Sequence, residues 1–172
     1  MQLALTYAKK MQADIVFATD PDCDRLGVIV RDGANWMRLN GNQMGSLLME
    51  YMLSQAKLKN QLAENSLVLK TIVTTGLQEK IAKYYGVDCI STLPGFKWIG
   101  GIIEAYEQGE RTPYRKFIAG SEESYGFLAG DFVRDKDAVI ASVLMADMAY
   151  CFKKENKSLL DALDDLYKRH GF

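Results

Sequence analysis

The sequence predicts an α/β protein in which helices cover a mixed, mostly parallel β-sheet, preceded by a separate strand and hairpin. Between residues 67 and 168, short runs rich in Val and Ile alternate with longer segments of helical periodicity, and this alternation is typical of a parallel sheet. Residues 14–40 differ, because two apolar runs flank an acidic turn and a third apolar run follows a glycine turn. A chain of 172 residues can bury one substantial core, or one domain and part of another.

The opening segment is expected to contain one helix and three strands. The helix is expected at 2–11, and the strands at 15–18, 26–30 and 36–39. A strand and a hairpin cannot form a complete sheet domain on their own. We therefore expect residues 1–40 to be the end of a domain whose beginning is absent, with a boundary near Asn40 and a compact unit at 41–172.

The second segment carries clear signals for helix ends. Asn40 can cap the first helix, Gly86 is a suitable residue for a helix C-terminus, and Ser158 with Asp161 predicts a capping box. The expected helices are 43–57, 77–85, 97–107, 137–154 and 158–168, and the expected strands are 67–74, 87–92 and 117–119. The glycine-rich, acidic stretch from 120 to 130 is expected to interrupt this pattern.

Composition narrows the class of protein. A formal net charge of -1, without a long Lys/Arg run, argues against a nucleic-acid partner. Three widely separated cysteines, Cys23, Cys89 and Cys151, favour a reducing compartment, so we expect a cytoplasmic protein. The first ten residues predict no signal peptide. We expect no membrane association, since the most apolar helix, at 138–152, is too short to span a bilayer and contains an aspartate.

The acidic turn after the first strand predicts a metal site. Asp20, Asp22 and Asp24 occupy alternate positions, and Arg25 follows at once. Three anions so close repel one another unless a cation lies among them. Oxygen ligands without His or Cys favour a hard cation, Mg²⁺ before Ca²⁺ or Mn²⁺. Arg25 could neutralise a phosphate beside that metal, whereas Cys23 is expected to point away.

The same turn has three alternative interpretations. A solvated acidic turn is the plain structural alternative. An EF-hand loop beginning at Asp20 fails, because it requires Gly where Arg25 stands and Glu where Arg31 stands. A phosphatase with Asp20 as nucleophile would share the Asp-x-Asp pattern with Asp22, and it remains the alternative enzyme.

A second candidate site follows the strand expected at 117–119. Glu122, Glu123 and Ser124 lie in a glycine-flanked loop, and ligands of parallel α/β units collect at the C-terminal ends of strands. A carboxylate can accept hydrogen bonds from two neighbouring hydroxyls, as sugar binding requires. An acidic surface loop is the equally simple structural interpretation.

Taken together, these segments resemble the α-D-phosphohexomutase superfamily of phosphoglucomutases and phosphomannomutases, in particular its type-2-like phosphoglucomutase branch. The matching segments follow the order of the family and are Thr19-Asp20-Pro21-Asp22-Cys23-Asp24-Arg25, Gly41-Asn42-Gln43-Met44-Gly45, Lys70-Thr71-Ile72-Val73-Thr74-Thr75, Gly95-Phe96-Lys97, Glu122-Glu123-Ser124-Tyr125-Gly126 and Arg134-Asp135-Lys136-Asp137. The resemblance implies that the chain holds the end of the family's domain 2, with the metal loop, and all of domain 3, with the sugar loop.

The resemblance also implies residue roles. The implied magnesium ligands are Asp20, Asp22 and Asp24, with a phosphoserine as the fourth ligand. Arg25 and Lys136 are the implied catalytic residues, beside the metal and closing on the sugar phosphate respectively. The implied substrate-binding residues are Glu122 and Ser124, which would hold the 3- and 4-hydroxyls, together with Glu123, Gly95, Lys97 and Lys70.

The implied reaction interconverts hexose 1-phosphate and hexose 6-phosphate through a phosphoserine and a hexose 1,6-bisphosphate. Pro94 and Ser121 depart from the family pattern, and neither a Ser-His-Asn phosphoserine loop nor the fourth domain's phosphate loop is present. We therefore expect the flanking domains of the same protein as partners and expect this chain alone to be inactive. His170 is expected in a C-terminal tail without a catalytic role. A non-catalytic sugar-phosphate-binding module is the third hypothesis.

Overall fold

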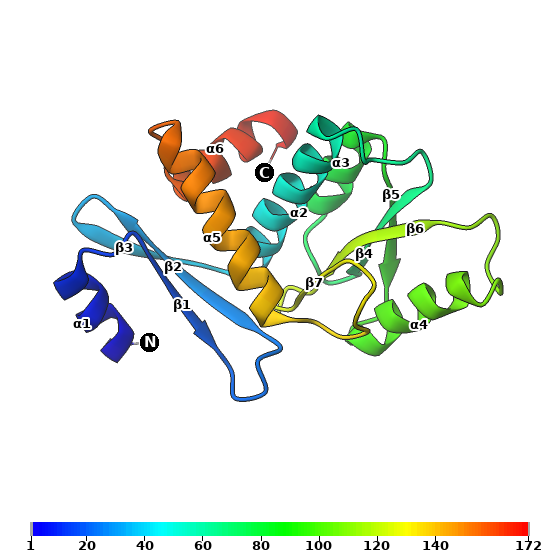
Figure 1. Cartoon of the computed structure of the whole chain (residues 1–172), viewed down its shortest axis with the longest axis horizontal. Coiled ribbons are helices and arrows are strands. Elements are labelled where there is room, and N and C mark those ends of the chain that lie inside the picture. The colour runs from blue at the N-terminus through cyan, green and yellow to red at the C-terminus, as the bar shows by residue number, and fades with distance from the viewer. Residues whose placement is uncertain (1, 172) are drawn as a thin grey trace.

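Two β-sheets surrounded by helices form the structure, a computed structural model that describes residues 2–171. The first sheet is antiparallel, and its strands β1 (Ile15–Thr19), β2 (Leu26–Asp32) and β3 (Asn35–Leu39) lie in chain order. Helix α1 (Gln2–Met11) packs on one face of this sheet, where Ala8 contacts Val16 and Ile29 (Figure 1).

The second sheet has the order β5-β4-β6-β7. Strands β4 (Ser66–Thr71), β5 (Asp88–Thr92) and β6 (Lys116–Ser121) are parallel, whereas β7 (Phe127–Ala129) pairs with β6 in the antiparallel sense. The sheet is therefore mixed and mostly parallel, which confirms the predicted fold class.

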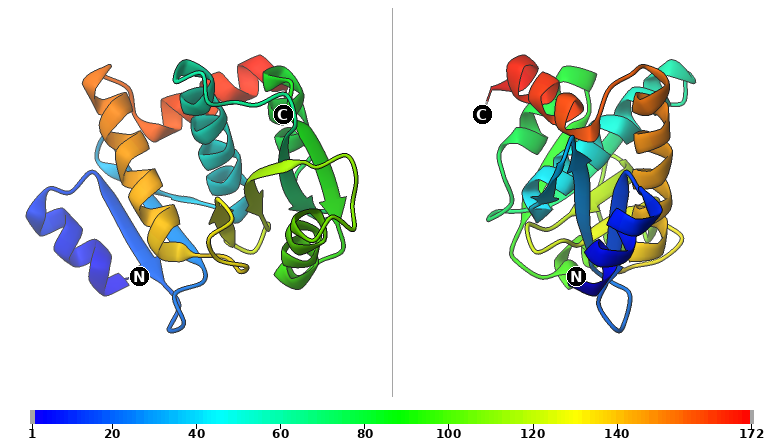
Figure 2. Two further views of the ribbon diagram at one scale, coloured as in Figure 1. Left: turned by 45° about the vertical axis from the view of Figure 1, so that its right-hand side comes forward. Right: turned by 90° about the vertical axis from the view of Figure 1, so that its left-hand side faces the viewer.

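Five helices pack around and between the sheets: α2 (Gly41–Leu58), α3 (Leu77–Tyr85), α4 (Phe96–Glu107), α5 (Ala138–Lys154) and α6 (Leu159–His170). Helix α4 covers one face of the second sheet, where Phe96 and Ile99 pack against Leu69. Helices α2 and α3 cover the other face, so the sheet lies between helix layers (Figure 2). Capping boxes at Asn40 and Ser158 begin α2 and α6. The sequence predicts the box at Ser158, whereas at Asn40 it predicts a cap without the Gln43 partner, and α2 begins two residues before the expected position 43.

One core joins the two sheets. The β2 side chains Leu26, Val28 and Val30 are buried in the same cluster as α2 residues such as Leu47 and α5 residues such as Met145. Figure 1 shows α5 lying across the first sheet and reaching towards the second. The domain boundary near Asn40 stays a prediction. The residues before and after it contribute to the same hydrophobic core.

Three details differ from the sequence-based expectations. The strand expected at 67–74 ends at Thr71, because the chain turns there and the Thr74 N–H donates to the Thr71 carbonyl at 3.1 Å. Strand β7 lies inside the stretch expected to be irregular. His170 is the last residue of α6 rather than part of a tail, and its side chain is buried beside Glu50.

Across residues 2–171, no helix has the combination of length and apolar character that crossing a membrane requires.

Candidate functional site

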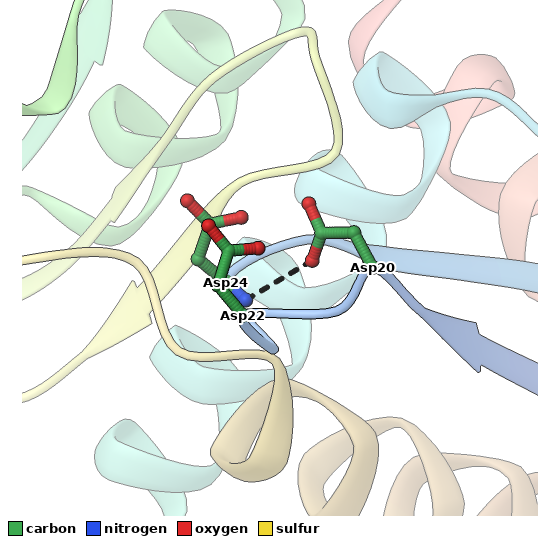
Figure 3. A group of neighbouring side chains, drawn as sticks. All are labelled: Asp20, Asp22 and Asp24. Carbon is green, nitrogen blue, oxygen red and sulfur yellow. Dashed lines mark hydrogen bonds between the residues drawn. The ribbon is translucent and has the colours of Figure 1, made fainter.

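The acidic turn between β1 and β2 brings its three aspartates together. One carboxylate oxygen from each of Asp20, Asp22 and Asp24 lies within 4.8 Å of the other two. Figure 3 shows the Asp20 carboxylate facing those of Asp22 and Asp24 across the turn. Cys23 adopts a left-handed conformation with φ 60° and packs against the core, so its side chain is not part of this group.

Hydrogen bonds from the following residues hold Asp20 in place. Its Oδ1 accepts from the backbone N–H groups of Arg25 at 3.0 Å and Asp24 at 3.2 Å, and its Oδ2 accepts from Arg25 Nε at 2.8 Å. The backbone bond from Arg25 is the main reason that the pKa of Asp20 falls to about 2. The carboxylate is therefore ionised at neutral pH, as a metal ligand must be.

Lys136 reaches the acidic turn from the segment before α5. Its Nζ lies 2.7 Å from Asp24 Oδ2 and 3.2 Å from Asp135 Oδ1. Burial lowers the pKa of Lys136, but the two carboxylates outweigh this effect and the pKa is raised. The two predicted catalytic residues thus both contact the acidic turn: Arg25 contacts Asp20 and Asp24, and Lys136 contacts Asp24.

The predicted sugar loop, residues 122–126 between β6 and β7, contains Glu122. This residue is only 7% exposed, and its carboxylate accepts a hydrogen bond from the Gly95 N–H at 3.1 Å. Burial raises the pKa of Glu122, although that hydrogen bond and the charge of Lys136 oppose the shift. Ser124 is exposed at the tip of the loop, and Lys97 is exposed on α4 with its Nζ 5.1 Å from the centre of the Trp98 ring.

The two loops lie side by side. The Leu26 N–H donates to the Tyr125 carbonyl at 3.2 Å, and Arg25 forms an isolated antiparallel bridge with Gly126. A Cβ on Gly126 would lie 2.6 Å from Lys136 Cδ and 3.2 Å from Glu122 Oε2. Gly126 therefore leaves room for Lys136 and Glu122 to approach each other. Because Lys136 Nζ also contacts Asp24, the acidic turn and the predicted sugar loop share one face.

Glu123 points to a different part of the site from Glu122. Its Oε2 accepts hydrogen bonds from the hydroxyls of Thr71 at 3.1 Å and Thr74 at 3.3 Å. Sequence reasoning assigned no role to these threonines, although they lie in the segment Lys70–Thr75 that supports the family resemblance. They tie the sugar loop to the end of β4.

Lys70 is held inside the protein. Its side chain is buried, and its Nζ lies 2.9 Å from Glu79 Oε1 and donates to the carbonyls of Thr71 and Thr74. The same ion pair lowers the pKa of Glu79. Lys70 could contact a substrate only by giving up these internal partners. Its substrate-binding role therefore stays a prediction.

Comparison with known proteins gives consistent matches along the chain. Residues 40–170 match the model of the phosphoglucomutase/phosphomannomutase α/β/α domain III, and residues 1–33 match that of domain II. A phosphoglucomutase of Staphylococcus epidermidis is 40% identical over 169 residues, which cover 98% of this chain and 29% of that relative. The chain thus spans less than a third of the length of this relative.

Solved structures share the fold. A phosphoglucomutase/phosphomannomutase family protein from Burkholderia thailandensis superposes with a TM-score of 0.70 and 18% identity, covering 96% of this chain and 31% of that chain. An N-acetylphosphoglucosamine mutase from Aspergillus fumigatus, in complex with GlcNAc-6P and magnesium, superposes with a TM-score of 0.55 and 16% identity, covering 83% and 33%. The resemblance seen in the sequence is confirmed: the chain belongs to the phosphoglucomutase/phosphomannomutase family.

Proposed function

We propose that this chain supplies the metal-binding and sugar-binding loops of a phosphohexomutase that interconverts hexose 1-phosphate and hexose 6-phosphate. The observation that carries the proposal is the joining of the two loops through the Leu26–Tyr125 hydrogen bond and the Arg25–Gly126 bridge. A phosphoryl group bound near Asp22 would then lie on the same face as Glu122. Since the chain spans 29% of its relative, the activity proposed is that of a protein of the relative's length.

The acidic turn fits magnesium by the chemistry of its donors. Three carboxylates without His or Cys form the oxygen-only set that Mg²⁺ prefers, and their oxygens lie within 4.8 Å of one another. The Aspergillus fumigatus relative is a complex with magnesium. When bound, the ion would act as a Lewis acid on a phosphoryl oxygen.

Arg25 and Lys136 would offset the remaining negative charge of a transferring phosphoryl group. Phosphoryl transfer depends mainly on positioning and charge neutralisation. Arg25 uses Nε for its contacts with Asp20 and Asp24, so its terminal amino groups remain available to phosphate oxygens. Lys136 lies between the acidic turn and Glu122 and could contact phosphate from the sugar side.

Glu122 and Ser124 would hold adjacent hydroxyls of the hexose. A reaction that moves phosphate between positions 1 and 6 requires the sugar to bind in two orientations, which suits a site with few contacts. A buried carboxylate left without its hydroxyl partner is costly, so Glu122 favours substrates that present both hydroxyls correctly. Such a site would tolerate glucose and mannose, which differ at C2.

The comparison with known proteins favours a mutase over the alternative phosphatase, because the relative that is 40% identical over 98% of this chain is a phosphoglucomutase. We also propose a cytoplasmic location, because Cys23, Cys89 and Cys151 are all unpaired.

Mg²⁺ binding tests the metal loop. Asp22 is exposed and makes no hydrogen bond within the described residues, so Asp22→Asn removes a ligand charge without breaking an internal contact. We expect Asp22→Asn to weaken Mg²⁺ binding, measured by calorimetry, by about tenfold. Asp32→Asn, an exposed aspartate on β2, is the matched control. Equal affinities of the wild type and Asp22→Asn would remove Asp22 from the site.

Hexose discrimination tests the proposed function directly. We expect glucose 1-phosphate to bind more tightly than its C4 epimer, galactose 1-phosphate, by about 1–3 kcal/mol. Glu122→Gln should remove most of this difference, because the amide can still accept from Gly95 but has one acceptor oxygen instead of two. Glu110→Gln, which changes an exposed glutamate, should leave the difference in affinity between the two epimers unchanged. No preference between the epimers in a heteronuclear NMR titration would contradict the proposal.

A further inference from the structure

A hollow of about 490 Å³ lies beside the acidic turn and contains an arginine that neither loop supplies. Its lining includes Arg25 from the turn, Arg38 from β3 and Tyr125 from the sugar loop. It therefore lies between the acidic turn, β3 and the sugar loop, next to the carboxylates of the candidate metal site.

The strand register explains why the hollow exists. Arg38 pairs with Ile29 across β2 and β3, and Ala18 pairs with Gly27 across β1 and β2. Side chains two residues apart on a strand point to the same face, so Gly27 and Ile29 share a face with Arg38 and Ala18. Gly27 has no side chain and Ala18 has only a methyl group. Among residues 2–171, therefore, no side chain of these two positions fills the space beside the two arginines.

Arg38 differs from the other arginines. Its guanidinium has no hydrogen bond, ion pair or ring contact with any residue between 2 and 171. The other six arginines each have such a contact, for example Arg115 with Asp88 and Arg169 with Glu50. An arginine without a partner, facing an open hollow, has all five N–H donors available for a ligand.

The charge of the hollow favours an anion. Asp20 also lines it, but the Asp20 carboxylate already accepts hydrogen bonds from Arg25 and Asp24. Arg25 contributes its terminal amino groups, and Arg38 contributes its whole guanidinium. Planar guanidinium groups match the oxygens of a phosphate two at a time.

We propose that Arg38, together with Arg25, forms a phosphate-binding subsite on this face of the first sheet, and that it takes the phosphate monoester group of a hexose phosphate. This inference rests on the proposed function, since the sugar loop supplies Tyr125 at the rim. Arg38 is then a phosphate-binding residue of the same site, and it is supplied by β3 rather than by the acidic turn or the sugar loop.

The test is a titration of the isotope-labelled chain with inorganic phosphate and with glucose 1-phosphate, in buffer containing EDTA and followed by NMR. Phosphate should shift the amide signals of Gly27 and Tyr125. Arg38→Gln should weaken binding of both probes by about tenfold, because a charged hydrogen-bonding partner is lost. Ala18→Leu, which fills the hollow and leaves both arginines in place, should also weaken binding.

The matched control is Arg31→Gln, the same change of charge on β2 and on the same sheet face. It should leave the affinity within about twofold of the wild type, as expected for a remote surface charge. The proposal is overturned if Arg38→Gln binds phosphate as the wild type does, or if Arg31→Gln weakens binding equally. Inorganic phosphate carries no sugar hydroxyls, so failure of the hexose discrimination test would leave this result unaffected.

Discussion

Replacing Gly41 with alanine is expected to destabilise the protein by about 3 kcal/mol, because the new methyl group has no space. A Cβ at this first residue of α2 would lie 2.0 Å from the carbonyl oxygen of Glu123 and 2.6 Å from the Tyr125 backbone nitrogen. Both neighbours are backbone atoms, so a rotamer change cannot relieve the overlap. The sugar loop would have to move away from the N-terminus of α2, and hexose binding should weaken with it.

Chemical denaturation measures this effect, and Gly101→Ala provides the control. Gly101 lies in α4 and is exposed, and a methyl group added to it would have no heavy atom within 4 Å apart from its chain neighbours and the backbone of its own helix. Alanine is the better helix former by up to about 1 kcal/mol, so Gly101→Ala should stabilise the protein. Opposite signs for the two substitutions are expected. A neutral result at Gly41 would show that the sugar loop does not press on α2.

Truncating Phe127 to alanine is expected to cost about 3–5 kcal/mol, as for other large buried aromatic side chains. Phe127 is 1% exposed and begins β7, directly after the sugar loop. It packs in the core that joins both sheets, and its carbonyl accepts a hydrogen bond from the Asp137 N–H at 2.8 Å. Loss of the ring should loosen both the sugar loop and the segment that carries Lys136.

Phe132→Ala is the control for this substitution, because Phe132 is 67% exposed. Its unfolding free energy should stay within about 0.5 kcal/mol of the wild type. Calorimetric melting of the two variants gives the comparison. If both variants melt at the wild-type temperature, then β7 does not contribute to the core as the structure indicates.

Local signals were sufficient for the helices and for the acidic turn between β1 and β2. The cap at Asn40 and the capping box at Ser158 depend on residues within one helical turn, so the sequence contains both partners of each interaction. The acidic turn is equally local, since Asp20 and Arg25 are five residues apart. These features were predicted because their determinants lie within one turn or loop.

Features set by distant residues could not be predicted. Strand β7 has only three residues and owes its conformation to pairing with β6. The partner of Thr71 is Glu123, 52 residues along the chain, and His170 is buried against Glu50 on another helix. Arg38 looks like an ordinary surface residue in the sequence, because the hollow it faces is formed by β1, β2 and the sugar loop.

The shared core also has an evolutionary consequence. Residues 1–33 and 40–170 match separate family models, yet Leu26 and Val28 on β2 are covered by helices of the second stretch. A substitution that enlarges either side chain is best accommodated by a smaller residue on α5 or α6, the helices that contact β2. Sequence changes in the two stretches should therefore be correlated across relatives, as they are between facing positions within one domain.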